Sequence, residues 1–253
     1  MLDFAHFEAE FEAVVAQLAG PPRLRLAPTP SGFLHAGNQL NFRWNAQLAR
    51  AHPQGRLLLR IDDLDQARKR PEYLQNIFDT LQILGIAPDE GPRDPIDFEQ
   101  NWSQQLRLPL YHAALEQLRA DGHLFACGLS RTELAALGGR YPPNLRDQGL
   151  SLDTPDVSWR IKTPPDFPLP DFIVRRRDGI PAYQLASMVD DLHFRITHVI
   201  RGADLLDSTR AQQYLAQCLG ATDFQQIVFL HHPLLLDAAG QKLSKSAGNG
   251  RSA

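Results

Sequence analysis

A short apolar run in the first third of the chain limits the possible folds more than any other feature. It reads Leu57-Leu58-Leu59-Arg60-Ile61, nearly continuous in its hydrophobicity and too short for a helix. Such a run is typical of a strand buried on both faces of a parallel sheet. A polar segment that begins with Asp62-Asp63 follows it. We therefore expect an α/β protein in which this strand ends at two carboxylates.

Other segments repeat the alternation of strand and helix patterns. Apolar spacing predicts helices over 4–18, from 36 to about 48, 106–119, 131–137 and 208–219, and strands over 24–27, 57–61, 196–200 and 227–230. Between Pro88 and Pro170 prolines cluster and periodicity is sparse, which indicates an inserted, loop-rich subdomain. Strands and helices alternate on both sides of it, so the sequence predicts a doubly wound parallel Rossmann-type sheet split by an inserted α+β subdomain.

This reading divides the chain into four parts. An N-terminal amphipathic helix occupies 1–20, and the first half of the nucleotide-binding domain occupies 21–90. The inserted subdomain takes 91–170, and the second half of the nucleotide-binding domain takes 171–253.

Composition excludes several classes of protein. With 253 residues, 43% of them hydrophobic, and a net charge of −3, the chain is neither collagenous, wholly disordered nor strongly cationic. It has no bulk basic field, which argues against indiscriminate polyanion binding but leaves room for a local basic groove for RNA. No stretch approaches the roughly 20 apolar residues of a membrane helix. We expect a cytoplasmic protein with neither a membrane nor DNA as its partner.

Two motifs could bind phosphates. The first, His35-Ala36-Gly37-Asn38, stands where a helix is expected to begin, so unpaired backbone N–H groups and an imidazole could meet an anion. Its alternative role is ordinary helix capping. The second, Lys242-Leu243-Ser244-Lys245-Ser246, could close two ammonium groups on a polyphosphate, or could be a solvated basic loop.

Taken together, these motifs resemble the H-I-G-H and K-M-S-K-S signatures of the class I aminoacyl-tRNA synthetases. Residues 25–35, Arg-Leu-Ala-Pro-Thr-Pro-Ser-Gly-Phe-Leu-His, resemble the R-F-A-P-S-P-T-G-x-L-H opening of the glutamyl branch, and 59–65 resemble its L-R-I-E-D-T-D. The segment 171–205, with Arg175-Arg176-Arg177-Asp178-Gly179 and Ile200-Arg201-Gly202, is most similar to the short paralogues of that branch, which attach glutamate to queuosine in tRNA(Asp).

The resemblance implies an ATP-dependent, AMP-forming ligase that makes glutamyl-adenylate and passes glutamate to tRNA. ATP would arrive with Mg²⁺. The family pattern assigns the ATP site and the catalytic groups to residues of the two signatures: His35, Gly37, Asn38, Lys242, Ser244 and Lys245. Among these His35, Asn38, Lys242 and Lys245 would be catalytic, although Lys245 could act without Lys242.

For the amino acid, the pattern implies a pocket made of Arg25, Thr29, Asp62, Tyr183 and Arg201. Asp62 and Tyr183 would take the α-ammonium group, and the two arginines would grip the side-chain carboxylate, since a guanidinium fork matches a carboxylate. The alternative is that Arg25 and Arg201 form structural ion pairs with nearby aspartates. Asp62 stands where glutamyl enzymes usually have Glu. The resemblance therefore implies its role in binding the α-ammonium group more firmly than it implies specificity for glutamate.

Two further departures affect zinc and tRNA. The queuosine-type paralogues carry a zinc pattern C-x-C…Y-x-x-x-C, but the matching positions here are Cys127, Leu129, Tyr141 and Leu145. One of three thiols remains, so we expect no structural zinc and no other protein-bound metal. The chain stops seven residues after Ser246, so we expect no anticodon-binding domain. The run 175–177 could contact an RNA phosphate or form a solvated turn.

Two other functions compete with this one. A ligase could pass the activated glutamate to a small molecule or a carrier protein. A non-catalytic paralogue could bind ATP or an amino acid and regulate a partner.

Overall fold

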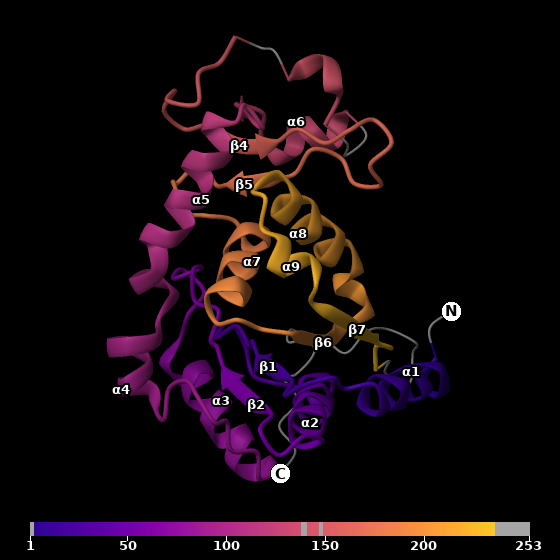
Figure 1. Cartoon of the computed structure of the whole chain (residues 1–253). Coiled ribbons are helices and arrows are strands. Elements are labelled where there is room, and N and C mark those ends of the chain that lie inside the picture. The colour runs from indigo at the N-terminus through magenta and orange to yellow at the C-terminus, as the bar shows by residue number, and fades with distance from the viewer. Residues whose placement is uncertain (1–2, 138–140, 147–148, 236–253) are drawn as a thin grey trace. The chain divides into compact units, whose positions relative to one another are not determined.

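The computed structural model describes residues 3–137, 141–146 and 149–235 (Figure 1). They fall into two compact units. The first takes in the chain up to residue 106, then 193–206 and the segment from 226 onward; the second takes in 107–192 and 207–225.

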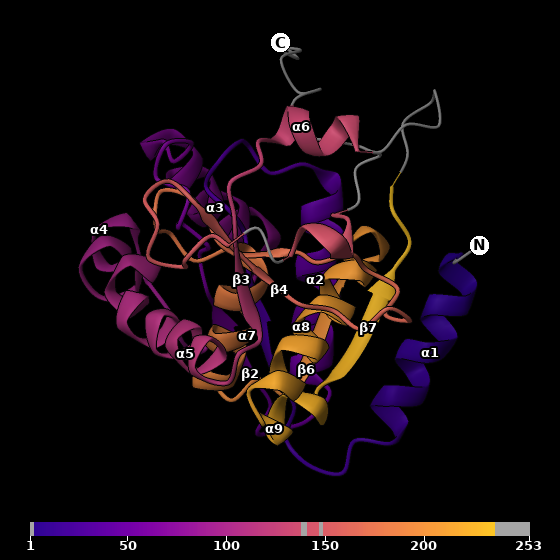
Figure 2. The same ribbon diagram turned by 90° about the horizontal axis from the view of Figure 1, so that it is seen from above.

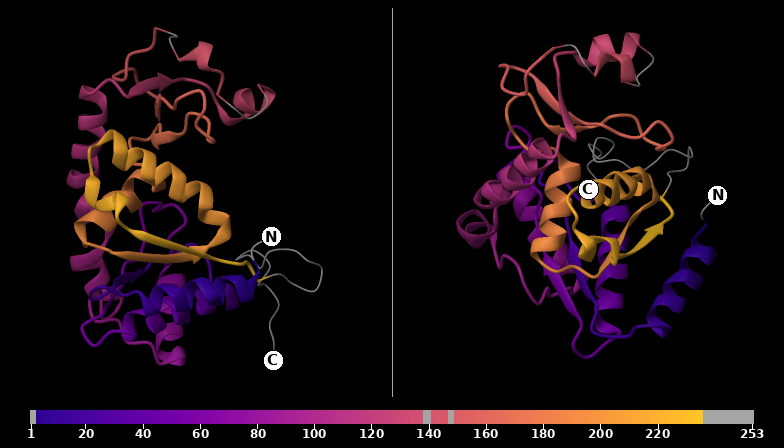
Figure 3. Two further views of the ribbon diagram at one scale, coloured as in Figure 1. Left: turned by 45° about the vertical axis from the view of Figure 1, so that its right-hand side comes forward. Right: turned by 45° about the horizontal axis from the view of Figure 1, so that its top comes forward.

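The first unit contains two pairs of parallel strands, β1 with β2 and β6 with β7. Figure 3 shows β6 and β7 side by side. The backbone N–H of Thr197, just before β6, donates to the carbonyl of Arg23 at the start of β1 (2.9 Å). The elements of the first unit are α1 (Phe4–Ala16), β1 (Arg23–Leu26), α2 (Ala36–Arg50), β2 (Arg56–Leu59), α3 (Pro71–Leu84), α4 (Pro95–Asp97), η1 (Phe98–Trp102), η2 (Gln104–Arg107, whose last residue belongs to the second unit), β6 (His198–Gly202), η4 (Ala203–Leu205) and β7 (Val228–His232).

Helix α1 packs on this unit through two aromatic rings. Phe7 and Phe11 are 0% and 3% exposed, and their ring centroids lie 5.1 and 4.8 Å from that of Trp44 on α2. Figure 2 shows the helix beside β7, where Phe7 meets the ring of His232 edge-on. Burying each phenylalanine stabilises this docking by roughly 1.5–3 kcal/mol. The phenylalanines therefore belong to the core of the first unit.

The outer edge of β2 is closed by the chain that follows α3. The N–H of Asp89 donates to the carbonyl of Leu57 (2.8 Å), and the N–H of Leu59 donates to that of Glu90 (2.9 Å). Gly91 makes this approach possible, because its φ is 109° and a Cβ there would lie 2.3 Å from the carbonyl oxygen of Leu59. The outward-facing carbonyl of Leu57 and N–H of Leu59 are thereby both hydrogen-bonded.

The second unit holds an antiparallel sheet in the order β3-β4-β5. In the interior of this unit, Arg107 donates two hydrogen bonds to the carboxylate of Asp190 (2.8 and 3.0 Å), and the Tyr111 hydroxyl donates to the same carboxylate (2.7 Å). Its elements are α5 (Leu108–Ala120), β3 (Leu124–Cys127), α6 (Arg131–Ala136), η3 (Pro143–Leu145), β4 (Ser158–Ile161), β5 (Ile173–Arg175), α7 (Tyr183–His193), α8 (Leu206–Cys218) and α9 (Thr222–Gln225).

The α/β class expected from the sequence is confirmed by the parallel pairs and their helices, and each predicted helix and strand is present within about three residues of its expected ends. Helices α3, α4, α7 and α9 and the strands β3, β4 and β5 were not predicted. Among the described helices, none is both long enough and apolar enough to cross a membrane.

Candidate active site

Three charged residues of the predicted pocket lie at strands of the first unit. Arg25 is on β1, Asp62 follows β2, and Arg201 is on β6. They are 4%, 7% and 4% exposed. Backbone pairing continues past the end of β2, since the N–H of Asp62 donates to the carbonyl of Pro28 (2.9 Å). The carboxyl ends of strands are where open α/β sheets bind ligands.

The Asp62 carboxylate is held by a neighbour that sequence reasoning missed. Arg60 donates from Nε to Oδ1 (2.7 Å) and from Nη2 to Oδ2 (3.0 Å), and the side chains of the pair are 1% and 8% exposed. Residues two apart along an extended chain share a face, so the spacing itself contained this signal. A carboxylate has about four lone-pair sites, and a partner that donates to both of its oxygens fixes its orientation.

The adjacent carboxylate has a structural role. Asp63 is 1% exposed and accepts from the Ser103 hydroxyl (2.7 Å), the N–H of Gln104 (2.8 Å) and Nζ of Lys69 (3.2 Å). The first two bonds join the segment after β2 to Ser103 and to the start of η2. The two neighbouring carboxylates thus have different roles. Asp62 pairs with Arg60, whereas Asp63 holds two distant segments of the chain together.

Arg201 is oriented by an aromatic ring of the next strand. Its guanidinium carbon lies 5.1 Å from the ring centroid of Phe229 on β7, a cation–π geometry that holds a planar guanidinium in place. Helix α2 also contacts this strand, because Asn41 donates from Nδ2 to the carbonyl of Ile200 (3.0 Å). Asn41, in the N-terminal half of α2, therefore holds the backbone of the residue that directly precedes Arg201.

The first signature forms the N-terminus of α2. Nδ1 of His35 accepts from the N–H of Gly37 (3.1 Å), and Asn38 Oδ1 accepts from the N–H of His35 (3.1 Å), which completes a capping box. Because Nδ1 is an acceptor, the neutral ring carries its hydrogen on Nε2. A Cβ at residue 37 would lie 2.9 Å from Cε1 of His35, which explains the glycine. Capping thus fixes the orientation of the imidazole at the N-terminus of α2.

A buried histidine of β7, His232, connects this strand to α2. Nδ1 of His232 donates to the carbonyl of Pro233 (2.8 Å), so Nε2 accepts from Nδ2 of Asn41 (3.2 Å). Burial lowers the pKa of His232 below its usual 6.5, although the Pro233 bond and the charge of Asp204 act in the opposite direction. The neutral ring is therefore the form that the fold requires.

We expect the free energy of unfolding to fall as the pH drops below about 6.5, because the unfolded chain takes up a proton that buried His232 resists. Above that pH this contribution is complete. His232→Gln keeps a donor and an acceptor and should flatten the dependence, while His198, whose pKa burial also lowers, retains its share. Urea unfolding at pH 7.5 and 5.5 measures the difference. Exposed His6→Gln is the control, and an unchanged slope in His232→Gln would contradict the assignment.

Two more residues of the predicted pocket stand apart from this group. Thr29 follows β1 in the first unit, where its carbonyl accepts from the N–H of Ser31 (2.9 Å). Tyr183 belongs to the second unit, where it begins α7 and is 41% exposed. There it lines a cavity of about 420 Å³ together with Tyr141, Arg160 and Gln184.

The second signature, with Lys242, Ser244 and Lys245, lies outside the described residues. Its assignment to the ATP site is taken up as a proposal below.

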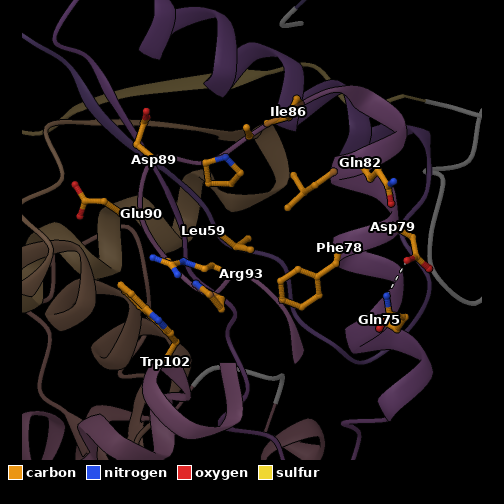
Figure 4. A pocket seen from close by; sticks show the side chains of 15 residues that line it. Leu59, Gln75, Phe78, Asp79, Gln82, Ile86, Asp89, Glu90, Arg93 and Trp102 are labelled. Atoms are coloured by element: carbon orange, nitrogen blue, oxygen red, sulfur yellow. Dashed lines mark hydrogen bonds between the residues drawn. The ribbon is translucent and has the colours of Figure 1, made fainter. Parts of the chain in front are cut away.

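A cavity of about 620 Å³ beside β2 contains none of the predicted site residues. Figure 4 shows Leu59, Phe78, Arg93 and Trp102 around it. Two of its carboxylates already have cationic partners, since Asp89 accepts from Arg50 (2.8 Å) and Glu90 from Arg23. The lining of this cavity mixes apolar side chains with Asp79, Asp89, Glu90 and Arg93, so carboxylates outnumber cations there.

The stretch that matches the zinc pattern forms a small apolar cluster in the second unit. Phe125, Cys127 and Tyr141 are buried there, and Leu129, Leu134 and Leu145 pack against them. The Tyr141 hydroxyl donates to the carbonyl of Leu145 (2.9 Å), and burial with the neighbouring Cys127 raises the pKa of Tyr141 to about 12. In the described residues no cluster of three or more His, Cys, Asp or Glu side chains could hold a metal ion. Leucines at two ligand positions and a bonded, protonated phenol do not fit zinc.

Comparison with known proteins places this geometry in a family. The sequence pattern of "tRNA synthetases class I (E and Q), catalytic domain" matches residues 22–141 and 147–250. The chain belongs to this family. A member from Ralstonia nicotianae, named glutamyl-Q tRNA(Asp) synthetase, is 37% identical over 94% of this chain and 81% of its own length. One of the same name from Pseudomonas aeruginosa is 38% identical over 88% of this chain and 76% of its own.

Solved structures of the family share the fold. The glutamate-tRNA synthetase of Elizabethkingia anophelis superposes with a TM-score of 0.76 at 27% identity and covers 91% of this chain. A glutamate tRNA ligase from Elizabethkingia meningosepticum gives a TM-score of 0.75 at 26% identity. The chain spans about half of the length of these two proteins, 54% and 53%.

Proposed function

We propose that this protein activates glutamate with ATP as glutamyl-adenylate and transfers the glutamyl group to queuosine in tRNA(Asp). The observation that carries the proposal is the set of buried Arg25, Asp62 and Arg201 at strands of the first unit, in a chain 37% identical to a glutamyl-Q tRNA(Asp) synthetase. Two guanidinium groups and a carboxylate complement the side-chain carboxylate and the α-ammonium group of glutamate.

Binding of glutamate is assigned to five residues. Arg25 and Arg201 take the side-chain carboxylate, because forked N–H donors match its two oxygens. Asp62, which Arg60 keeps in one orientation, takes the α-ammonium group, a role that the family pattern also gives to the hydroxyl of Tyr183. Thr29 completes the pocket. Glutamine would leave the arginines facing a neutral amide, and this desolvated charge disfavours it.

Adenylation requires positioning and neutralisation of charge more than acid or base chemistry. One oxygen of the α-carboxylate attacks the α-phosphorus of ATP, and the bond to pyrophosphate breaks. His35 donates from Nε2, with Gly37 and Asn38 at the helix N-terminus, and Lys242, Ser244 and Lys245 close over the leaving phosphates. The triphosphate would carry Mg²⁺, which would offset part of its charge.

ATP–pyrophosphate exchange tests the proposal. With Mg²⁺ we expect exchange that depends on L-glutamate, and far less with glutamine or aspartate, before any tRNA is added. Transfer of labelled glutamate to tRNA(Asp) that contains queuosine, but not to tRNA(Asp) with guanosine at that position, identifies the acceptor. ATP binding without exchange under any condition would favour a regulatory paralogue. Exchange followed by transfer only to small molecules or carrier proteins would favour the other ligase.

The apolar cluster around Cys127 supports a further part of the proposal, that the insertion folds without zinc. We expect the purified protein to contain substoichiometric zinc and to keep its Tm when EDTA is added. The double variant Leu129→Cys/Leu145→Cys restores the C-x-C…Y-x-x-x-C pattern and should gain a Tm that depends on zinc. Stoichiometric zinc in the unaltered protein, with a Tm lowered by EDTA, would contradict this expectation.

A further inference from the structure

Three arginines of the second unit line one cavity of about 410 Å³. Arg160 reaches it from β4, and Arg176 and Arg177 from the turn after β5. Their neighbour Arg175 is engaged elsewhere, with its guanidinium carbon 4.7 Å from the ring centroid of Trp159. The basic run noted in the sequence is therefore divided, and two of its members join a third arginine that is distant in sequence.

Arg160 is a buried cation without a carboxylate partner among the described residues. It is 8% exposed, its Nη1 donates to the backbone carbonyl of Asp171 (2.7 Å), and its guanidinium carbon lies 5.1 Å from the ring centroid of Tyr141. Its Nε is buried and has no hydrogen-bond partner in the described structure. A buried charge of this kind is unfavourable unless an anion neutralises it.

The carboxylate of Asp171, whose backbone carbonyl Arg160 contacts, cannot serve this purpose. Both oxygens of Asp171 accept from Arg146 (2.6 and 2.7 Å), and Oδ1 also accepts from the backbone and side chain of Thr163 (2.8 and 3.0 Å). Arg160 meets the carbonyl of that residue instead. The charge of Arg160 therefore remains to be matched from the cavity.

Arg176 and Arg177 are exposed and weakly engaged. Arg176 donates to Asp178 (2.6 Å) in a pair whose side chains are 44% and 48% exposed, and Arg177 donates to the carbonyl of Gly128. An exposed ion pair contributes at most about 1 kcal/mol, so an incoming anion can displace Asp178. Both guanidinium groups can turn toward a ligand at little cost.

Other polar groups at the cavity are already bonded. Ser158 donates its hydroxyl to the carbonyl of Cys127 (3.2 Å). The Ser130 hydroxyl accepts from the N–H of Glu133, whose carboxylate in turn accepts from the N–H of Ser130 (2.6 Å). Asp178 remains as the carboxylate that lines the cavity, so the lining carries an excess of positive charge.

We propose that this cavity binds a phosphate group of the RNA substrate, with Arg160 facing the phosphodiester from the interior and Arg176 and Arg177 closing over it from the turn. The paired N–H donors of a guanidinium group match phosphate oxygens. Three guanidinium groups supply more N–H donors than one carboxylate ligand could accept. Arg160 also lines the cavity that holds Tyr183, so the phosphate would lie beside a residue assigned to glutamate. The RNA identity rests on the proposed function, whereas the anion site does not.

Binding of fluorescently labelled tRNA to the full chain, measured by anisotropy over a series of KCl concentrations, tests this site. We expect Arg176→Ala/Arg177→Ala to raise Kd about tenfold and to reduce the slope of log Kd against log salt by about 1, as for one lost phosphate contact. The matched control is Arg210→Ala, an arginine of the same unit that is 45% exposed and paired with Asp207 (2.9 Å). An unchanged Kd and slope in the double variant, or an equal change in the control, would overturn the proposal.

Arg160 needs a gentler substitution because it is buried. Arg160→Lys keeps the charge and loses the fork, and we expect a rise in Kd with an unchanged Tm. Inorganic phosphate at matched ionic strength should compete with tRNA in the unaltered protein and not in the double variant. Competition by phosphate together with an unchanged tRNA Kd in the variant would assign the cavity to free phosphate and overturn the RNA assignment. Anisotropy requires no turnover, so a lack of pyrophosphate exchange would overturn the proposed function without affecting this test.

Discussion

Arg201→Met should lower kcat/KM for glutamate in pyrophosphate exchange by roughly two to three orders of magnitude. Truncating one member of a buried, hydrogen-bonded charge pair costs about 2–5 kcal/mol, because the other charge is left desolvated. Methionine keeps the length of the stem beside Phe229 and removes the charge. We expect glutamate to lose far more than glutamine, so the ratio of their kcat/KM values should collapse.

Two comparison variants make this result interpretable. Arg43→Met, an exposed change on α2, should leave exchange unaltered. Arg201→Lys keeps the charge without the fork and should fall between the unaltered protein and Arg201→Met. A folded Arg201→Met protein that keeps kcat/KM for glutamate within threefold would show that this arginine is a structural ion-pair partner, as the alternative reading has it.

Lys245→Ala should lower kcat for exchange by about 10²–10³-fold and leave KM for glutamate near its original value. A cation aimed at developing charge acts in the transition state more than in the bound ground state, so its loss appears in kcat. The same substitution at Lys242 distinguishes two hypotheses. A comparable loss indicates that both ammonium groups hold the phosphates, and full activity indicates that Lys245 acts alone.

Lys162→Ala is the matched control, because that lysine donates to the carbonyl of Gly122 in the second unit. It should leave exchange unchanged. A Lys245→Ala protein with full exchange activity would remove the second signature from the mechanism and would leave the helix N-terminus at His35 as the phosphate site.

The local parts of the fold could be predicted because their signals lie within a few residues. The continuous apolar run of β2, the spacing of Phe4, Phe7 and Phe11 in α1, and the start of α2 at His35 all have the expected structure. Helix α3 carried comparable signals, with Pro71 in its first turn and Gly85 in the left-handed conformation at its end. Both signals lie within the segment itself, so α3 is predictable from the sequence.

The non-local parts could not be predicted for a physical reason. Asp63 finds its partners Ser103 and Gln104 forty positions later, and Asn41 meets His232 across most of the chain. Neither pairing leaves a periodic trace in the sequence. The antiparallel pairing of β3 with β4 likewise depends on contacts that only the folded second unit brings together. The fork of Arg60 on Asp62 is intermediate, since its spacing of two is a local signal that has meaning only once the strand is known.

The closed outer edge of β2 has a consequence for the behaviour of the protein in concentrated solution. An open strand edge offers unpaired N–H and C=O groups to a second molecule and can template aggregation. Here the segment at Asp89 and Glu90 already occupies those groups at Leu57 and Leu59, and it can lie that close because residue 91 has no side chain. Gly91 therefore helps to prevent aggregation. A larger residue there would displace the covering segment and leave the edge of β2 unpaired in an otherwise native fold.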